Sequence, residues 1–141
     1  MDLAAIADKA EIVVVGEVDS SQVSKVAGSV YTFATISVDE TLKGAPGATV
    51  RVAVPGGARA SGRFQVSEIV AGAPLIPVDT TQLLFLEANA ALGAYQIVGF
   101  NQGAFLVLED VSAGARSASA VGASGERITL DDARAAVRAS D

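Results

Sequence analysis

The sequence predicts a mainly β fold: a curled antiparallel barrel of five or six strands with short N-terminal and C-terminal helices. Half of the 141 residues are apolar, and this content is aliphatic, with five Phe, two Tyr and no Trp. Val and Ile favour pleated, half-buried surfaces, and here many of them alternate with polar residues, which is the period of a strand. Gly-rich breaks separate these segments at close intervals, as in small barrels and sandwiches.

The first elements along the chain are a short helix and a buried strand. Residues 2–10 carry apolar side chains at helical spacing, with Asp2 as the N-cap. The run 12–18 reads as a buried strand, with a bulge predicted at Gly16 where the sheet curls. The polar residues 19–25 are interpreted as a connection.

A hairpin is predicted next. Residues 30–42 alternate along their whole length, which indicates a long strand with Ile36 on its inner face. A Gly- and Pro-containing turn leads to a second strand at 50–54. Tyr31 and Phe33 lie on the outer face, as a binding patch or packed beneath a terminal helix; packing is the favoured interpretation.

The C-terminal half continues with shorter elements, and the whole chain, 1–141, is predicted to be a single domain. A flexible stretch is expected at 58–62, and a loose Ser/Ala/Gly-rich segment at 112–125, because such residues bury too little to offset chain entropy. Thr129 and Asp132 resemble a capping box that opens a helix over 129–140. Further strands are predicted around Phe64 and Val66 and at 83–86, 95–98 and 105–108.

Composition excludes several function classes. Ten basic and sixteen acidic residues give a net charge of −6, which disfavours nucleic acid and anionic membrane surfaces as partners. There is no Cys and no His, so thiolate and imidazole metal ligands, disulfides and the usual general base are missing. No apolar run approaches the roughly 20 residues of a membrane span. We therefore predict a soluble protein that is not an enzyme, with no cofactor and no metal.

Paired acids give no catalytic pattern. The pairs at 39–40, 109–110 and 131–132 are adjacent in sequence. Neighbouring residues on a strand point to opposite faces, whereas an acid and base of the glycosidase type must face each other across a cleft. These carboxylates are interpreted as solvated strand ends or as charges at a helix N-terminus.

One segment has the opposite charge to the rest of the protein. Between Thr41 and Ser67 there is no acidic residue, while four basic residues fall there. Gly amides and guanidinium groups suit carboxylates and phosphates, so this segment is the candidate partner-binding site. The alternative is a strand terminator followed by solvated arginines. The candidate residues are Arg51, Pro55, Gly56, Gly57, Arg59 and Arg63.

Several stretches resemble a family of small secreted bacterial proteins of uncharacterised function. They are ADKAEIVVVGEV at 7–18, VDETLKG at 38–44, VPGG at 54–57, LLFLE at 83–87 and YQIVG at 95–99. The order of elements is more distantly similar to the OB-like barrel of the tissue inhibitors of metalloproteases. The resemblance implies an OB-like fold and an association with a secreted metalloprotease. Those inhibitors use an N-terminal Cys and disulfides, which this chain lacks.

The sequence begins without a recognisable secretory signal, so either the protein is cytosolic or a leader has been removed. The resemblance favours an extracytoplasmic protein, periplasmic or secreted, whose signal peptide is absent from this sequence. The expected function is a noncatalytic protein-binding or inhibitor-like module, with a secreted protease as the first candidate partner. The alternative is a structural or assembly subunit that pairs through exposed strand edges.

Overall fold

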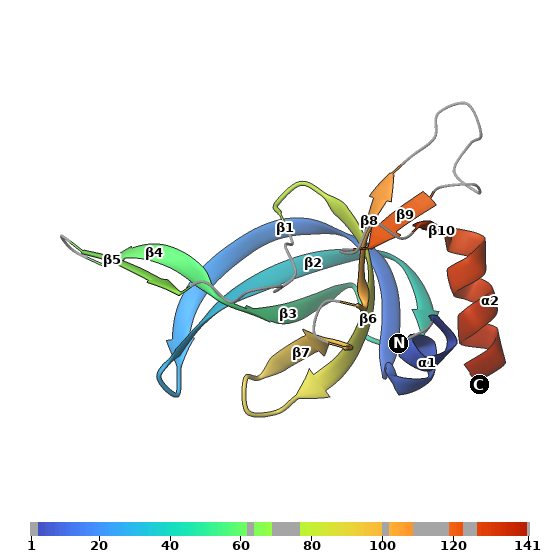
Figure 1. The fold of residues 1–141 in the computed structure, drawn as a ribbon, viewed down its shortest axis with the longest axis horizontal. Helices are drawn as coiled ribbons and strands as arrows, with labels where there is room; N and C mark the ends of the chain where they lie inside the picture. The colour runs from blue at the N-terminus through green and yellow to red at the C-terminus, as the bar shows by residue number, and fades with distance from the viewer. Residues whose placement is uncertain are drawn as a thin grey trace.

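The structure is a computed structural model that describes residues 3–61, 64–68, 77–99, 102–108, 119–122 and 127–140. Over these residues the chain is mainly β, with ten strands and two helices (Figure 1). The predicted class, mainly β with a helix near each end, is confirmed. The elements are α1 Leu3–Lys9, β1 Ile12–Val26, β2 Ser29–Lys43, β3 Thr49–Pro55, β4 Gly57–Ser61, β5 Phe64–Glu68, β6 Thr81–Asn89, β7 Ala94–Ile97, β8 Ala104–Leu108, β9 Ser119–Gly122, β10 Arg127–Thr129 and α2 Leu130–Ser140.

Eight of the strands form one sheet in the order β1-β2-β3-β7-β6-β8-β9-β10. Strand β1 also pairs with β6, so β1, β2, β3, β7 and β6 close a ring of five strands. Every pairing in the ring is antiparallel except that of β3 with β7, a single parallel bridge between Val52 and Tyr95. Strands β4 and β5 form a separate antiparallel pair.

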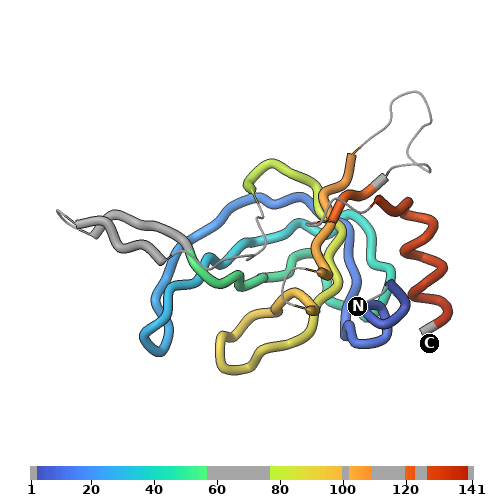
Figure 2. The backbone as a smooth tube through the Cα atoms, in the orientation of Figure 1, coloured from blue at the N-terminus to red at the C-terminus, as the bar shows by residue number. Residues whose placement is uncertain are grey.

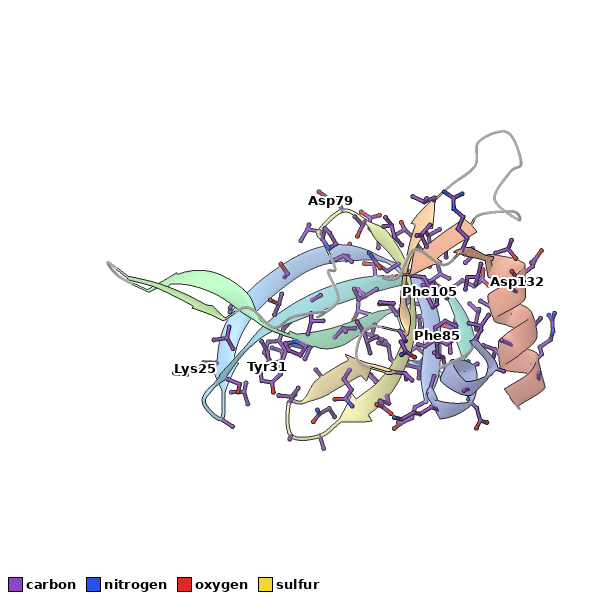
Figure 3. All side chains as sticks on the ribbon, in the orientation of Figure 1. Lys25, Tyr31, Asp79, Phe85, Phe105 and Asp132 are labelled. Carbon is purple, nitrogen blue, oxygen red and sulfur yellow. The ribbon has the colours of Figure 1, made fainter. Side chains whose placement is uncertain are left out.

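Two apolar clusters lie on opposite faces of β1 and β6. Ile12 and Val14 belong to an inner cluster that also takes buried side chains from β2, β3, β6 and β7. Val13 and Val15 belong to a second cluster, the helix cluster, which α1 and α2 cover. Strands buried on both faces read as continuous apolar runs, which explains the sequence Ile12–Val15. In the helix cluster Phe85 meets Phe105 edge-to-face, with ring centroids 5.9 Å apart (Figure 3).

Strand β1 is longer than the sequence predicted. Residues 19–25 continue the strand to Val26 and pair with β2, so their interpretation as a connection was wrong. The hairpin turns at Ala27 and Gly28, whose φ angles of 52° and 88° match the positive φ of a type I′ turn. Asp19, Ser20, Ser21 and Gln22 are all exposed. This half buries little on either face, so it carries no apolar pattern to reveal a strand.

The register is irregular where the sequence predicted a bulge, but the extra residue is on the partner strand. Val15 pairs with Glu40 and Gly16 with Val38, so Asp39 of β2 is the bulged residue and Gly16 lies opposite the bulge. A side chain at Gly16 would overlap the carbonyl oxygen of Ser37 and lie 2.6 Å from Ile36 Cγ2. Only glycine allows β2 to approach this closely. Ile36 itself is fully buried in the inner cluster, as its predicted position on the inner face requires.

The two helices pack side by side at one end of the molecule (Figure 2). Lys43 Nζ at the end of β2 donates a 2.8 Å hydrogen bond to the carbonyl of Ala7 in α1. The capping box of α2 is reciprocal: Asp132 N donates to Thr129 Oγ1, and Thr129 N to Asp132 Oδ2, each at 3.0 Å. This predicted motif is confirmed, and the predicted N-cap Asp2 lies outside the described residues.

Two predictions of irregular structure need correction. Residues 57–61, where a flexible stretch was expected from 58, form β4 and pair with β5. Within the segment 112–125, residues 119–122 form β9 between β8 and β10. The rest of that segment lies outside the described residues.

Candidate protein-binding face

The three-stranded part of the sheet formed by β1, β2 and β3 has an outer face that points away from the inner cluster. Its register places Ser20, Thr35 and Arg51 in one row across the three strands. Because side chains two residues apart share a face, the neighbouring rows follow from this one. We call this surface the outer face; its members are Ser20, Gln22, Tyr31, Phe33, Thr35, Arg51, Ala53 and Pro55.

Arg51 lies over an aromatic ring on the outer face. Its guanidinium carbon is 4.3 Å from the ring centroid of Phe33 on β2, a cation–π contact that keeps the charged group in place while leaving its N–H donors available. Phe33 is buried, and its ring centroid is 6.3 Å from that of Tyr31. Arg51 is exposed, and it forms no ion pair with any residue in the described part of the chain.

Hollows border this aromatic pair on two sides. The first, about 340 Å³, is lined by Ser20, Ser21, Gln22, Phe33, Thr35 and Arg51. The second, about 390 Å³, opens where β3 and β7 separate beyond their single bridge, and Tyr31 and Pro55 are among the residues that line it. Its far wall carries two linked hydrogen bonds. Asn89 Nδ2 donates to Gln96 Oε1, and Gln96 Nε2 donates to Glu87 Oε1, both at 2.9 Å.

The predicted loop at residues 55–57 lies at the end of β3. Pro55 is the last residue of that strand and lines the larger hollow. Gly56 has a φ of 92°, its N–H donates to the carbonyl of Val30 at 2.8 Å, and its own carbonyl accepts from Thr32 Oγ1 at 2.8 Å. The Gly56 amide therefore already has an acceptor inside the protein. Gly57 begins β4.

Of the three predicted arginines, Arg51 alone has a described side chain. Arg51 lies on β3, and Arg59 lies on β4 opposite Val66. The Arg59 side chain and the whole of Arg63 lie outside what the structure describes. Lys43, the fourth basic residue of the acid-free segment, is held by α1. Arg51, Pro55 and their aromatic neighbours are thus the described part of the candidate site.

The structure gives roles to two of the acid pairs. Glu40 on β2 accepts two hydrogen bonds from Arg134 in α2, at 2.7 and 2.8 Å, and Asp131 accepts a third at 2.8 Å. The hydrogen bonds that Arg134 donates to Glu40 lower the pKa of Glu40 and raise the pKa of Arg134. Glu109 and Asp110 lie outside the described residues. In the part of the chain that is described, no three acidic side chains converge on a possible metal position.

Sequence reasoning missed the contact between Arg51 and Phe33. The favoured prediction, that Tyr31 and Phe33 pack beneath a terminal helix, was wrong: Phe33 is buried, but neither residue belongs to the cluster that the helices cover. The alternation pattern could have revealed the contact: with Thr35 opposite Arg51, Phe33 is the diagonal neighbour on the same face.

No protein-family model, curated protein or solved structure matches the chain. Among the described helices, none has the length and apolar character needed to cross a membrane.

Proposed function

We propose that the chain is a noncatalytic, extracytoplasmic protein-binding module of the inhibitor type, built on an OB-like barrel. In this proposal it binds a carboxylate-bearing segment of its partner on the outer face. The observation that carries it is the exposed guanidinium of Arg51, fixed over Phe33 above a hollow lined by hydroxyl and amide side chains. Guanidinium groups and carboxylates form geometrically specific hydrogen bonds.

The ring of strands supports the OB-like part of the proposal. OB folds are five-stranded, partly open Greek-key barrels that bind ligands on the face of their second and third strands and on the adjacent loops. Here the second and third strands of the ring are β2 and β3, and they carry the Arg51–Phe33 contact. This comparison is one of architecture, and the site residues themselves must carry the function.

Charge supports a protein as the partner. OB folds also bind oligonucleotides, but the net charge of −6 opposes a phosphate backbone. A carboxylate presented by a protein is attracted locally, because charges within roughly 8 Å of each other are only partly screened in physiological salt. The distant likeness to metalloprotease inhibitors makes a secreted metalloprotease the first partner to test.

The proposal is tested by selecting twelve-residue peptides displayed on phage against the immobilised protein. We expect the selected peptides to be rich in Asp and Glu, and to bind Arg51→Ser roughly fivefold more weakly, with a shallower salt dependence, because an exposed ion pair contributes up to about 1 kcal/mol. The triple variant, in which Ser replaces Arg51, Arg59 and Arg63, should bind these peptides no more tightly than Arg51→Ser does. Arg138→Ser, at an exposed arginine in the last turn of α2, is the matched control and should bind as wild type.

Peptides with no acidic bias, or with equal affinity for wild type and Arg51→Ser, would contradict the proposed site. The inhibitor function is tested separately with thermolysin as the probe. We expect a stoichiometric loss of its peptide hydrolysis, which Arg51→Ser weakens. Unchanged hydrolysis at saturating protein would leave a binding module without inhibitory action on this class of protease.

The second candidate function, a structural or assembly subunit, is favoured by the edge of β1 beyond Val18, which pairs with no other strand than β2 among the described residues. Light scattering separates the two functions. The binding module is expected at the mass of one chain, 14.2 kDa. A larger mass that depends on protein concentration would favour assembly.

A further inference from the structure

Among the described residues, strand β1 pairs with two strands along its first half and with one along its second. Residues 12–17 pair with β6 on one side and with β2 on the other. Val18 still exchanges hydrogen bonds of 2.9 and 2.8 Å with Thr80 and Asp79. From Asp19 to Val26 the strand pairs only with β2 in the described part of the chain, and Figure 1 shows β1 continuing beside β2 to their hairpin. Asp19 to Gln22 are exposed.

The hydrogen-bonding direction of this edge follows from the register. The carbonyl of Val30 accepts from Gly56, so it points toward β3. The N–H and C=O groups of successive residues alternate in direction along an antiparallel strand. Those of Thr32 and Ala34 therefore also point toward β3. Their partners on β1, together with the partner of Val30, must then direct their N–H and C=O groups away from β2. These partners are Ser21, Val23 and Lys25.

The open edge leads directly to the candidate site. Ser20 on the edge strand, Thr35 and Arg51 form one row across the outer face, and the first two are small hydroxyl residues. A strand added to β1 would lie two strand spacings, roughly 10 Å, from β2. The guanidinium of Arg51 lies above β2, over the ring of Phe33. An extended Glu side chain spans about 5 Å, and an ion pair spans about 4 Å. Together they cover most of the distance between the added strand and the guanidinium of Arg51.

We propose that the partner binds by strand addition: an extended segment pairs with Ser21, Val23 and Lys25 on the open edge of β1, and its carboxylate crosses Ser20 and Thr35 to reach Arg51. Main-chain hydrogen bonds supply affinity in this mode, and side-chain sites supply specificity. The inference rests on the proposed function and adds the binding mode. A partner strand with a carboxylate fits better than a second copy, because each copy carries a net charge of −6.

Among the described residues, Lys25 is the one feature of this edge that usually protects edge strands; there is no Pro and no bulge from Ser20 to Val26. Native proteins protect edges with Pro, bulges or inward-pointing charges. The described register has its last irregularity at Asp19, and from Ser20 to Val26 the pairing is regular. Lys25 is the one charged residue within this regular stretch, and it lies near the hairpin tip (Figure 3). A partner of opposite charge removes its protective effect.

The test uses a pool of octapeptides with Glu fixed at the fourth position and Thr or Val elsewhere, together with a matched pool in which Gln replaces Glu. Two further pools carry N-methyl groups on alternate amides, at odd or at even positions. We expect one methylated pool to lose binding and the other to keep it, because a strand pairs through every second residue. We expect the Gln pool to bind the wild-type protein roughly fivefold more weakly than the Glu pool. The two pools should bind Arg51→Ser with equal affinity.

A variant of the protein tests the same edge. Val23→Pro removes an outward N–H, and edge strands tolerate proline, so we expect near-native melting and roughly fivefold weaker peptide binding. Val23→Thr keeps the N–H and should bind as wild type. The methylated pools give the same answer on the wild-type protein, so the result does not depend on the folding of the proline variant.

Equal binding of both methylated pools, with Arg51 still required, would overturn strand addition and leave the proposed function standing. A second outcome would also overturn strand addition alone. In this outcome the phage-selected peptides bind, but the octapeptide pool does not bind at about 1 mM, which corresponds to a binding free energy near −4.1 kcal/mol. No binding of either set would overturn both proposals. A dimeric mass that Val23→Pro abolishes would place a second copy on the edge and overturn the partner-strand inference.

Discussion

The two halves of β1 belong to one strand but have opposite environments. In the first half, residues 12–17 pair with both β2 and β6, and residues 12–15 are covered on both faces, by the inner cluster and by the helix cluster. Residues 19–26 pair with β2 alone within the described chain, and their first four side chains are exposed. The buried half is Val-rich and the open half is rich in Ser. One element therefore combines a part that stabilises the fold with a part that is available for binding.

The largest expected effect tests the buried half. Ile36 lies opposite Val18, where this half ends, and its side chain is fully buried. Ile36→Asp places an unpaired charge in the inner cluster, at a cost of several kcal/mol or by neutralisation of the acid. We expect the variant to be unfolded at room temperature, as measured by circular dichroism. A wild-type melting curve would contradict the description of the ring interior.

A smaller effect is expected at the bulge. Gly16→Ala places a methyl group against the Ser37 carbonyl and Ile36 Cγ2, and backbone atoms cannot move aside as a flexible side chain would. We expect a loss of about 1–3 kcal/mol in the free energy of unfolding, typical of overpacking, measured by urea denaturation. Gly28→Ala is a useful contrast: nothing lies near its Cβ position, but its φ is 88°. Equal stability of Gly16→Ala and wild type would show that β2 can shift.

A third, smaller effect depends on pH. The folded-state pKa of Glu40 lies below its ordinary value of 4.5 because Arg134 donates hydrogen bonds to it. The ionised side chain thus stabilises the fold fully above pH 4.5, and this contribution is lost as the pH falls through the lowered folded-state pKa. Glu40 is 43 % exposed, so solvent screens the pair. We expect Glu40→Gln to lose at most about 1 kcal/mol at pH 7.

Denaturation across the pH range checks this expectation. The difference between wild type and Glu40→Gln should disappear at low pH, where the wild-type carboxyl is also neutral. Asp39→Gln is the control, since Asp39 is exposed and precedes the pair. A difference that persists unchanged in acid would show that Glu40 acts through packing and not through its charge.

The smallest expected effect tests the open half of β1. Gln22 is exposed, and its side chain forms no hydrogen bond with the described residues. Gln22→Ala should change the free energy of unfolding by no more than about 0.5 kcal/mol, measured by urea denaturation. A loss above 1 kcal/mol would mean that the open half contributes to stability as the buried half does.

The elements that the sequence predicted are those with a local cause. Alternation revealed the β2–β3 hairpin and the inner position of Ile36, and the pair Thr129 and Asp132 revealed the start of α2. The open half of β1 was missed because no burial imposes a pattern on it. The bond between Glu40 and Arg134 was missed because 94 residues separate the partners. For the candidate site, Arg51 and Pro55 were predicted, but their aromatic neighbours were not connected with them.

The single parallel bridge between Val52 and Tyr95 has a consequence for the order in which the protein folds. The β1–β2–β3 meander forms from neighbouring segments. Closing the ring requires β6 and β7 to pair with β1 and β3 across the residues 56–80, which include β4 and β5, at an entropic cost. Non-local pairings of this kind slow folding. We therefore expect the meander to be structured in the transition state and the β3–β7 seam to close last. In the native protein, we expect the ring to open locally at this seam first.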